Sequence, residues 1–440
     1  MTRLARLTFA SLAVRNYRLY FFGMLISASG TWMQSVAQGW LVLRLTGSGT
    51  AVGLVTAMQF VPMLVGGAWG GVIADRFDKR RTLLASQAAL GAVAAVLATV
   101  TITGVVTVWM VFLAAFLTGC ATVIDTPTRQ AFVCELVGPD RLANAVALNS
   151  AMFNAARVVG PAIAGGLILV GGTGTCFAFN AVSYMAVMVG LAVMRTDELQ
   201  RTERVAKSRG QVREGLRYVA STPTLRSTLL MVAVVGTFSL NFTVLMPLLA
   251  RFTFRAGPGT LGLLTSTMGL GSLVGALAAA ARAKPSPRLL RGAAAVLGLA
   301  MAGIAFAPAL PVALAFLAVA GAAAITFLAT ANSLLQLTSS GAMRGRVMAL
   351  YALVFLGSTP IGGPIVGATA QRFSPGAGFL VGAVAALAAA AWSLVGARRG
   401  LRRGRPPLDG ASVLGDGAGE HAAAVRGHEH VVLDADTDAA

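Results

Sequence analysis

Charged side chains are scarce in this sequence of 440 residues. Only 12% of the residues are Asp, Glu, Lys or Arg, whereas 56% are hydrophobic, and the mean hydropathy is +0.75. Soluble globular domains carry about 25% charged residues. The composition therefore excludes a soluble globular protein and indicates an integral membrane protein.

Acidic residues are rarer than basic ones, with 16 against 35, so the formal net charge is +19. Such an excess of positive charge can indicate binding to nucleic acid. Here the basic residues are dispersed among short segments between apolar runs, and none of these segments is long enough to fold as a separate domain. We therefore expect no nucleic-acid partner.

Cysteine and histidine are almost absent. Cys120, Cys134 and Cys176 lie far apart without a Cys-x-x-Cys pair, and all three histidines follow residue 420. This distribution indicates neither a metal site nor a disulfide framework. No nucleophile and base pair and no nucleotide-binding loop occur in the sequence either, so we expect no enzyme activity, no cofactor, no metal and no use of ATP.

Long apolar runs are abundant. Each is about 20 residues long, which is the length that crosses a bilayer as a helix. The runs lie near residues 19–43, 51–74, 82–103, 105–125, 145–170 and 175–194, and then near 227–250, 260–281, 289–308, 312–334, 347–370 and 376–397. The first is too long for a cleaved signal, so we expect it to be retained. The pattern predicts an all-α integral membrane protein with twelve transmembrane helices.

The twelve runs form two sets of six. Shifting the second set along the first aligns Gly160 with Gly362 and Gly165 with Gly367, which is typical of parallel structural repeats. We predict an N-terminal half over residues 1–194, a cytoplasmic linker over 195–226 and a C-terminal half over 227–397. The linker contains Val212, Leu216 and Val219 among charges, a pattern that favours an amphipathic surface helix, and residues 398–440 are expected to form a disordered cytoplasmic tail.

Basic residues lie mainly on one side of the predicted membrane. If the N-terminus is inside, the opposite side keeps only Arg44, Arg251, Arg255 and Arg372. Because loops rich in Lys and Arg stay cytoplasmic, this bias places both termini in the cytoplasm. We expect a monomer that spans the cell inner (plasma) membrane several times, with membrane lipid around it.

A charged segment with the sequence GVIADRFDKRR separates the second and third runs, from Gly71 to Arg81. Gly71 would let one helix approach another closely, and Asp75 could lie against the positive N-terminus of a neighbouring helix. Arg76 and Arg80 mark a face that stays cytoplasmic. The alternative is an ordinary basic loop, which would explain the charges but not the Gly-x-x-x-Asp-Arg spacing.

The fifth run contains a proline among glycines and a polar stripe. Gly160, Pro161 and Gly165 would permit a kink and close helix packing. Asn154 and Arg157 share a helical face with a nearby serine. An arginine inside a membrane costs about 2.5 to 3.5 kcal/mol, so Arg157 should face a cavity or a partner. It is a candidate contact for a polar or anionic substrate group; the alternative is a structural ion pair or carbonyl contact.

Further polar residues lie inside the predicted spans. Asp125 and Arg129 are spaced i, i+4 and can pair on one helical face. Gln34 and Gln38 share a face of the first span and are candidates to line a central cavity. Residues Gln59, Asn180 and Asn241 could join them. For each of these amides the alternative is a hydrogen bond between helices.

The segment from Gly71 to Arg81 resembles the signature loop of the major facilitator superfamily, Gly-x-x-x-Asp-Arg-x-Gly-Arg-Arg, with Asp78 at the second glycine and Lys79 at the first arginine of the pair. This departure is expected to loosen the turn. The Gly160–Gly166 segment is similar to the Gly-Pro-x-x-Gly-Gly motif of exporters in that superfamily. The longer stretches 125–161 and 344–362 resemble its enterobactin-exporter and macrolide-efflux branch.

This resemblance implies the major facilitator fold and export of siderophores or hydrophobic drugs driven by protons. It implies that Asp75, Arg76, Arg80 and Asp125 form a charge relay, which holds the cytoplasmic side shut near Arg344. Asp125 is then the first candidate for proton coupling and Asp75 the second. Two other hypotheses stay open: a metabolite importer of the same superfamily, and a membrane sensor or scaffold that transports nothing.

Overall fold

The computed structural model describes residues 8–200, 211–281 and 285–402. The chain divides into a first unit that ends at Ala391 and a second that begins at Trp392. Within the described ranges every regular element is helical. Residues 403–440 of the tail that we expected to be disordered lie outside the described ranges, as does part of the linker. The last helix, α14 (Pro375–Arg402), runs beyond the predicted end at residue 397.

The N-terminal part begins with a short turn of helix and continues with five long helices. These are η1 (Ala10–Ala13), α2 (Arg15–Thr46), α3 (Gly49–Arg76), α4 (Lys79–Ile102), α5 (Val108–Val137) and α6 (Pro139–Ala192). α6 is broken at Gly172, where the backbone has φ 76° and ψ −178°. Side chains rarely adopt this conformation, so the sequence requires glycine there. The two parts of α6 correspond to the fifth and sixth predicted spans.

The predicted linker contains η2 (Thr196–Glu198) and α7 (Gln211–Ser221), and the C-terminal part follows it. The elements of the C-terminal part are α8 (Pro223–Phe238), α9 (Phe242–Leu248), η3 (Leu249–Thr253), α10 (Pro258–Ala280), α11 (Pro287–Ala305), α12 (Leu310–Thr338), α13 (Gly341–Arg372) and α14. α8, α9 and η3 together occupy one membrane-length stretch, Pro223–Thr253. The break between α8 and α9 leaves Asn241 at the start of α9.

Ten helices in the described residues are long and apolar enough to cross a membrane. The predicted number of twelve is not reached by this criterion, for two reasons. The stretch Pro139–Ala192 counts once although Gly172 divides it. α2 is 32 residues long, but polar side chains such as Gln34 and Gln38 lower its hydropathy. The predicted all-α membrane class agrees with the observed elements.

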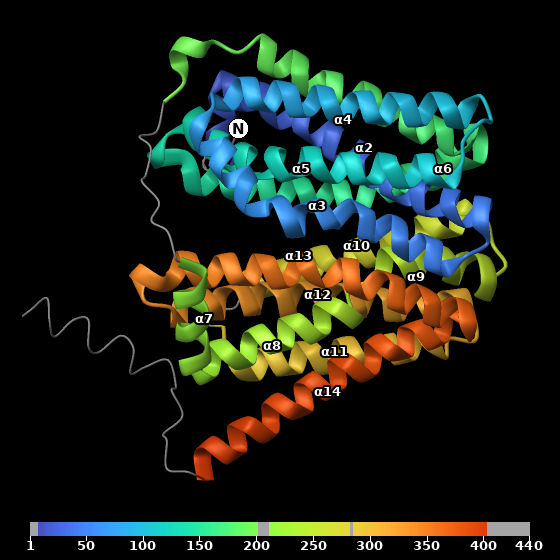
Figure 1. The fold of residues 1–440 in the computed structure, drawn as a ribbon, viewed down its shortest axis with the longest axis vertical. Coiled ribbons are helices and arrows are strands. Elements are labelled where there is room, and N and C mark those ends of the chain that lie inside the picture. The colour runs from blue at the N-terminus through green and yellow to red at the C-terminus, as the bar shows by residue number, and fades with distance from the viewer. Residues whose placement is uncertain (1–7, 201–210, 282–284, 403–440) are drawn as a thin grey trace, which may run out of the picture. The chain divides into compact units, whose positions relative to one another are not determined.

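Helices α2 to α6 pack among themselves, as do α8 to α13, and Figure 1 shows these two sets one above the other. α3 packs along α13, and the first part of α6 packs along α10, so these four helices join the sets. A side chain at Gly262 of α10 would meet the carbonyl oxygen of Pro161 at 2.7 Å. Small residues therefore allow the helix backbones to approach closely.

The glycines aligned by the sequence repeat make equivalent contacts. Gly160 packs against α2 and its counterpart Gly362 against α8, the first membrane helix of each set. Gly165 packs against α10, and its counterpart Gly367 packs against α3. In both cases the contact is with the second membrane helix of the opposite set. These contacts repeat from one set of helices to the other, as the aligned glycines do in the sequence, whereas the division into halves over 1–194 and 227–397 stays a prediction.

The linker helix α7 packs on the C-terminal set. Glu214 of α7 forms an ion pair of 2.7 Å with Arg346 of α13. Val219 is buried in a cluster with Leu225, Leu350 and their neighbours, whereas Leu216 is exposed. α7 is thus the short amphipathic helix that the linker sequence predicts.

Candidate functional site

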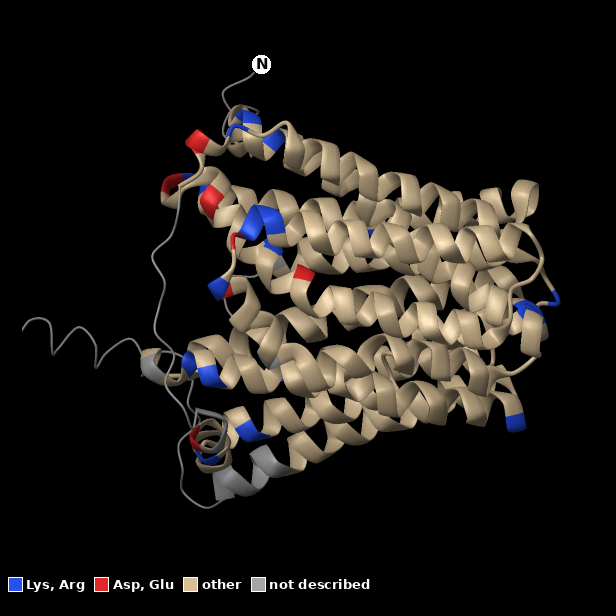
Figure 2. Cartoon of the chain, turned by 45° about the horizontal axis from the view of Figure 1, so that its top comes forward, with Lys and Arg blue, Asp and Glu red and all other residues tan. Residues whose placement is uncertain are grey.

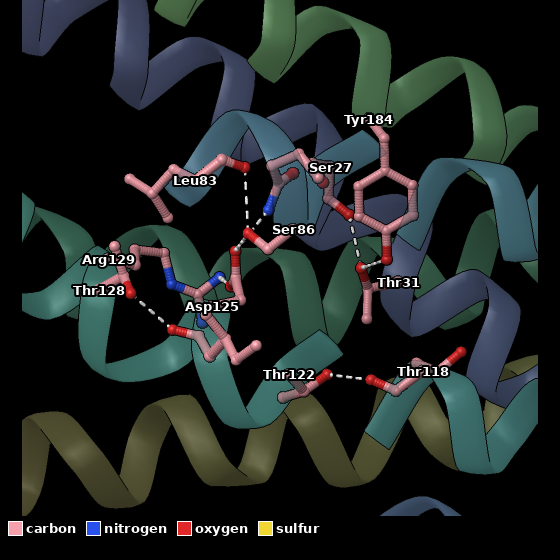
Figure 3. A network of polar contacts seen from close by, with 12 residues as sticks. Ser27, Thr31, Leu83, Ser86, Thr118, Thr122, Asp125, Thr128, Arg129 and Tyr184 are labelled. Carbon is pink, nitrogen blue, oxygen red and sulfur yellow. Dashed lines mark hydrogen bonds and ion pairs between the residues drawn. The ribbon is translucent and has the colours of Figure 1, made fainter. Parts of the chain in front are cut away.

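Asp125 is a buried carboxylate in α5, with only 3% of its surface exposed. Ser86 Oγ and Gln87 Nε2, both from α4, donate hydrogen bonds of 3.0 and 2.7 Å to its Oδ1 atom. The guanidinium of Arg129 lies 3.3 Å from its Oδ2 atom, one helical turn along α5 (Figure 3). The i, i+4 spacing therefore brings Asp125 and Arg129 together, and α4 completes the shell around the carboxylate.

Sequence reasoning missed Ser86 and Gln87. Both are buried in an otherwise apolar part of α4, and the Oε1 atom of Gln87 has no hydrogen-bond partner. Polar side chains inside a membrane helix usually face a polar partner, so their occurrence in this run was the available signal. Arg129 has a second contact, with its guanidinium carbon 5.1 Å from the centre of the Phe153 ring.

The turn between α3 and α4 is tied to α5 and α6. Asp78 caps α4 by accepting a 2.8 Å hydrogen bond from the Arg81 backbone, so the residue at the second glycine position of the motif orders the turn, where we expected a looser one. Lys79 pairs with Glu135 of α5 at 2.5 Å. Arg80 donates to the carbonyl oxygen of Leu191, at the end of α6, at 2.7 Å.

Two residues of the predicted relay, Asp125 and Arg80, have different surroundings. Asp125 is surrounded by α4 and α5, and the Arg80 guanidinium binds the last carbonyls of α6. Asp75 and Arg76 are exposed at the C-terminal end of α3. Gly71 is half-buried in the same helix, and the close approach of α3 to Val123 of α5 occurs at its neighbour Gly70.

Gln34 of α2 is directed at α6. Asn180 Nδ2 donates a 2.7 Å hydrogen bond to Gln34 Oε1, and both residues are buried. Ser183 Oγ donates to Asn180 Oδ1 at 3.0 Å. Neither Gln34 nor Gln38 lines the cavity described next, so Gln34 has the hydrogen bond between helices that was the alternative for these amides.

A cavity of about 280 Å³ lies between the two sets of helices. α2, α3 and α6 line it from one side, and α8, α9, α10, α12 and α13 line it from the other. Most of the wall is apolar and aromatic. The side chains Trp32, Phe60, Phe242, Met268, Leu328 and Phe355 contribute to it. Such a cavity suits a ligand with an apolar body.

Arg157 and Asn241 supply polar groups to this cavity. The Arg157 guanidinium carbon lies 5.2 Å from the centre of the Trp32 ring, and its Nε atom is buried without a hydrogen-bond partner. Asn241 donates to the Thr237 carbonyl oxygen at 2.6 Å, whereas its Oδ1 atom is buried and unpartnered. Asn154 does not line the cavity, because its side chain donates to the carbonyl oxygen of Ser150 on its own helix.

The glycine and proline motif positions Arg157. A side chain at Gly160 would lie 2.7 Å from the Ser29 carbonyl oxygen and from the Cβ atom of Trp32, so α6 fits tightly against α2 at this point. On its other side α6 meets α10 at Pro161 and Gly165. The motif therefore holds Arg157 where three helices meet.

Known proteins with similar sequences and folds agree with this architecture. The family model described as transmembrane secretion effector matches residues 6–403. The multidrug efflux pump Tap of Mycolicibacterium fortuitum is 31% identical over 377 residues, which cover 82% of this chain and 91% of that protein. The staphyloferrin A transporter of Staphylococcus aureus is 28% identical over 173 residues, which cover 39% of this chain and 44% of that protein.

Solved structures show the same fold at low identity. The inward-facing, unoccupied crystal structure of a bacterial homolog to the human lysosomal transporter Spinster superposes with a TM-score of 0.67 and 15% identity. The match covers 88% of this chain and 96% of that chain. The resemblance to the major facilitator superfamily is confirmed. The chain therefore belongs to the transmembrane secretion effector family of that superfamily, and it is a multi-pass membrane transporter of a small molecule and not an enzyme.

Proposed function

We propose that this protein exports small, largely apolar molecules from the cytoplasm by proton antiport, with alternating access between the halves 1–194 and 227–397. The cavity between the two sets of helices carries the proposal, because a ligand there contacts both halves at once. A relative movement of the halves would then change the side from which the ligand is reached. The efflux activity named for the Tap relative supports export as the direction.

Polar contacts between the halves support the alternating movement. At the end of the helices opposite the turn between α3 and α4, Ser48 and Thr50 donate to Gln371 Oε1 at 2.7 and 2.8 Å. Arg251 donates to the Leu43 carbonyl oxygen at 3.0 Å. Hydrogen bonds of this kind can be exchanged for water when the halves separate, so they suit a closure that opens again.

Asp125 is the proposed site of proton coupling. As a carboxylate it pairs with Arg129, whereas the protonated acid would lose the charge that holds this arginine. Arg129 would then depend on its contact with Phe153 and on water. Because Asp125 also binds α4 through Ser86 and Gln87, a proton would loosen the packing of α4 against α5.

The turn between α3 and α4 is the proposed gating element. Lys79 and Arg80 link it to α5 and α6, so a displacement of the turn reaches both helices. We propose that Gly71, Asp75 and Arg76 close the cytoplasmic side against α13 near Arg344, as the family motif implies.

The proposed orientation has both termini in the cytoplasm of a monomer in the cell inner membrane. Figure 2 shows that charged residues gather at the end of the helices that carries the turn between α3 and α4. Few charges occur at the opposite end, among them Arg44 and Arg372. This distribution supports a cytoplasmic location for the charged end.

The test is efflux of hydrophobic drugs and siderophores from cells that express the wild type, Asp125→Asn or Arg157→Ala, with and without a protonophore. We expect the protonophore to abolish efflux, and Asp125→Asn to lower it by roughly tenfold or more because the side chain can no longer exchange a proton. The matched control is Asp140→Asn, which removes an exposed carboxylate in the first turn of α6.

Two results would contradict this proposal. If neither the protonophore nor Asp125→Asn changes efflux, the transport is not proton antiport. If no compound leaves the cells although the wild type is folded in the membrane, export itself is wrong, and uptake of labelled metabolites becomes the next measurement.

A further inference from the structure

We infer that the cavity between the halves binds lipophilic acids: compact molecules with an apolar body, one anionic group that meets Arg157 and one hydrogen-bond donor that meets Asn241. This inference deepens the proposed transport function and rests on it for its biological meaning. Binding itself can be measured without transport, so the two can fail separately.

The charge of the cavity favours an anionic ligand. Among the described residues that line it, Arg157 is the only ionisable side chain, so its positive charge has no carboxylate beside it. The guanidinium stacks on Trp32, and its Nε atom is buried without an acceptor. An anionic ligand would supply both the missing charge and the missing hydrogen bond. A lipophilic cation would find no counter-charge and would be repelled by Arg157.

The buried carboxylate of Asp125 does not supply a negative charge to this cavity. It lies on α5, which contributes no residue to the cavity wall, and its oxygens are already bound by Ser86, Gln87 and Arg129. The acid that serves proton coupling in the proposed function is therefore separate from the group that selects the ligand.

The hydrogen bonding of Asn241 favours a ligand that carries a hydrogen-bond donor. Its amide nitrogen donates to the Thr237 carbonyl oxygen, which fixes the side chain, and its Oδ1 atom is buried without a donor. A buried acceptor that lacks a donor is unfavourable until one arrives. A hydroxyl or N–H group on the ligand would satisfy it.

The size of the cavity favours a compact ligand. At about 280 Å³ the cavity lies just below the range of roughly 300 to 1,000 Å³ that is usual for drug-sized ligands, so a compact molecule fills it. Aromatic side chains on α2, α3, α9 and α13 line this volume and favour a flat, aromatic body.

A series of naphthalene compounds tests all three arguments. The probes are 6-hydroxy-2-naphthoate, 2-naphthoate, methyl 2-naphthoate and (2-naphthylmethyl)trimethylammonium, which carry an acid with a donor, an acid alone, a neutral ester and a cation. Binding to the full chain in lipid nanodiscs is followed by fluorescence anisotropy, and empty nanodiscs correct for partition into lipid. We expect affinity to fall in the order given.

The variants assign each preference to its residue. Arg157→Gln should weaken the binding of both acids by about tenfold or more, because a charge-assisted hydrogen bond is lost. The same variant should leave the binding of the ester unchanged. Asn241→Leu should remove only the advantage of the hydroxyl group. Asn241→Asp places a carboxylate in the same cavity and should shift the preference toward the cation. Arg44→Gln, which removes an exposed arginine of α2 outside the cavity, is the matched control.

The inference is overturned if the cation binds as tightly as the acids, if Arg157→Gln keeps full affinity for them, or if none of the four probes binds. If Arg157→Gln does not fold, the shift expected for Asn241→Asp decides the question alone. Binding of acids that depends on Arg157 but leads to no movement into proteoliposomes keeps this inference and removes the transport proposal. Proton-driven movement of the ester and the cation, without a preference for acids, keeps the transport proposal and removes this inference.

Discussion

At the scale of single residues, the buried polar groups of this protein differ in what they do. Asp125 and Arg129 pair because they lie one turn apart on the same helix, so their contact could be predicted from spacing alone. Arg157 could be predicted to face a cavity or a partner, because an arginine is costly in lipid. The pairing of Gln34 with Asn180 could not, because the two residues lie on different helices whose relative rotation no single sequence specifies.

This pair permits a test of whether these amides serve structure. Gln34→Leu leaves the Asn180 amide without its acceptor and should destabilise the protein by about 1 kcal/mol. The double variant Gln34→Leu/Asn180→Leu removes both partners and should recover part of that loss. The measurement is thermal unfolding of purified protein in detergent. A double variant whose loss of stability equals the sum of the two single losses would show that the amides do not act as a pair.

At the scale of helices, hydropathy locates the membrane crossings and one of two breaks in the helices. The gap predicted between the fifth and sixth spans, residues 171–174, contains Gly172, where the structure breaks α6. The seventh span is predicted as one run, whereas the structure interrupts it before Asn241. Hydropathy records how apolar a segment is, whereas this second break depends on local backbone conformation and on the neighbouring helix, so it stays invisible in the pattern.

Helix packing gives a prediction from three glycines. Gly160→Ala and Gly262→Ala would each push a methyl group to 2.7 Å from a backbone oxygen, of Ser29 and Pro161 respectively. Each should destabilise the protein by about 1 to 3 kcal/mol through overpacking. Gly166→Ala is the matched control in the same motif, because no atom lies within 4 Å of the added group. The midpoint of thermal unfolding in detergent measures all three, and equal midpoints would contradict the packing described.

At the scale of the whole transporter, the sequence repeat predicted two related sets of helices, and the paired glycine contacts agree with it. The site between the sets was less accessible to prediction. Asn241 could be suggested as a cavity residue, but the aromatic lining from α2, α3, α9 and α13 comes from segments far apart in the chain. One sequence does not order such segments in space, so the volume of the cavity and its lack of acidic groups emerge only from the structure.

The contacts of Gln371 give a prediction about movement between the halves. In a background without native cysteines, Thr50→Cys and Gln371→Cys are joined by a short, cleavable bifunctional thiol reagent. Their side chains are in hydrogen-bond contact, so we expect efficient linkage. If transport requires the halves to separate at this end, the link should lower it by about tenfold or more, and reduction should restore it.

The control for this experiment links two helices of one half. Ala305→Cys in α11 and Gly376→Cys in α14 are suitable, because a side chain at Gly376 would lie 2.9 Å from the Ala305 carbonyl oxygen. This link should leave transport unchanged. Full transport by the protein linked between residues 50 and 371 would contradict a movement that opens this end.

The break at Gly172 also matters for anyone who labels or tags this protein. The two spans of α6 meet in a turn fixed by Thr175, whose hydroxyl donates to the Gly172 carbonyl oxygen at 2.6 Å, so no loop projects from the helices there. An epitope or fluorescent protein inserted at this turn would force apart two helices that are joined without an intervening loop. Reporters for this face belong instead between α4 and α5, where residues 103–107 lie outside helical structure.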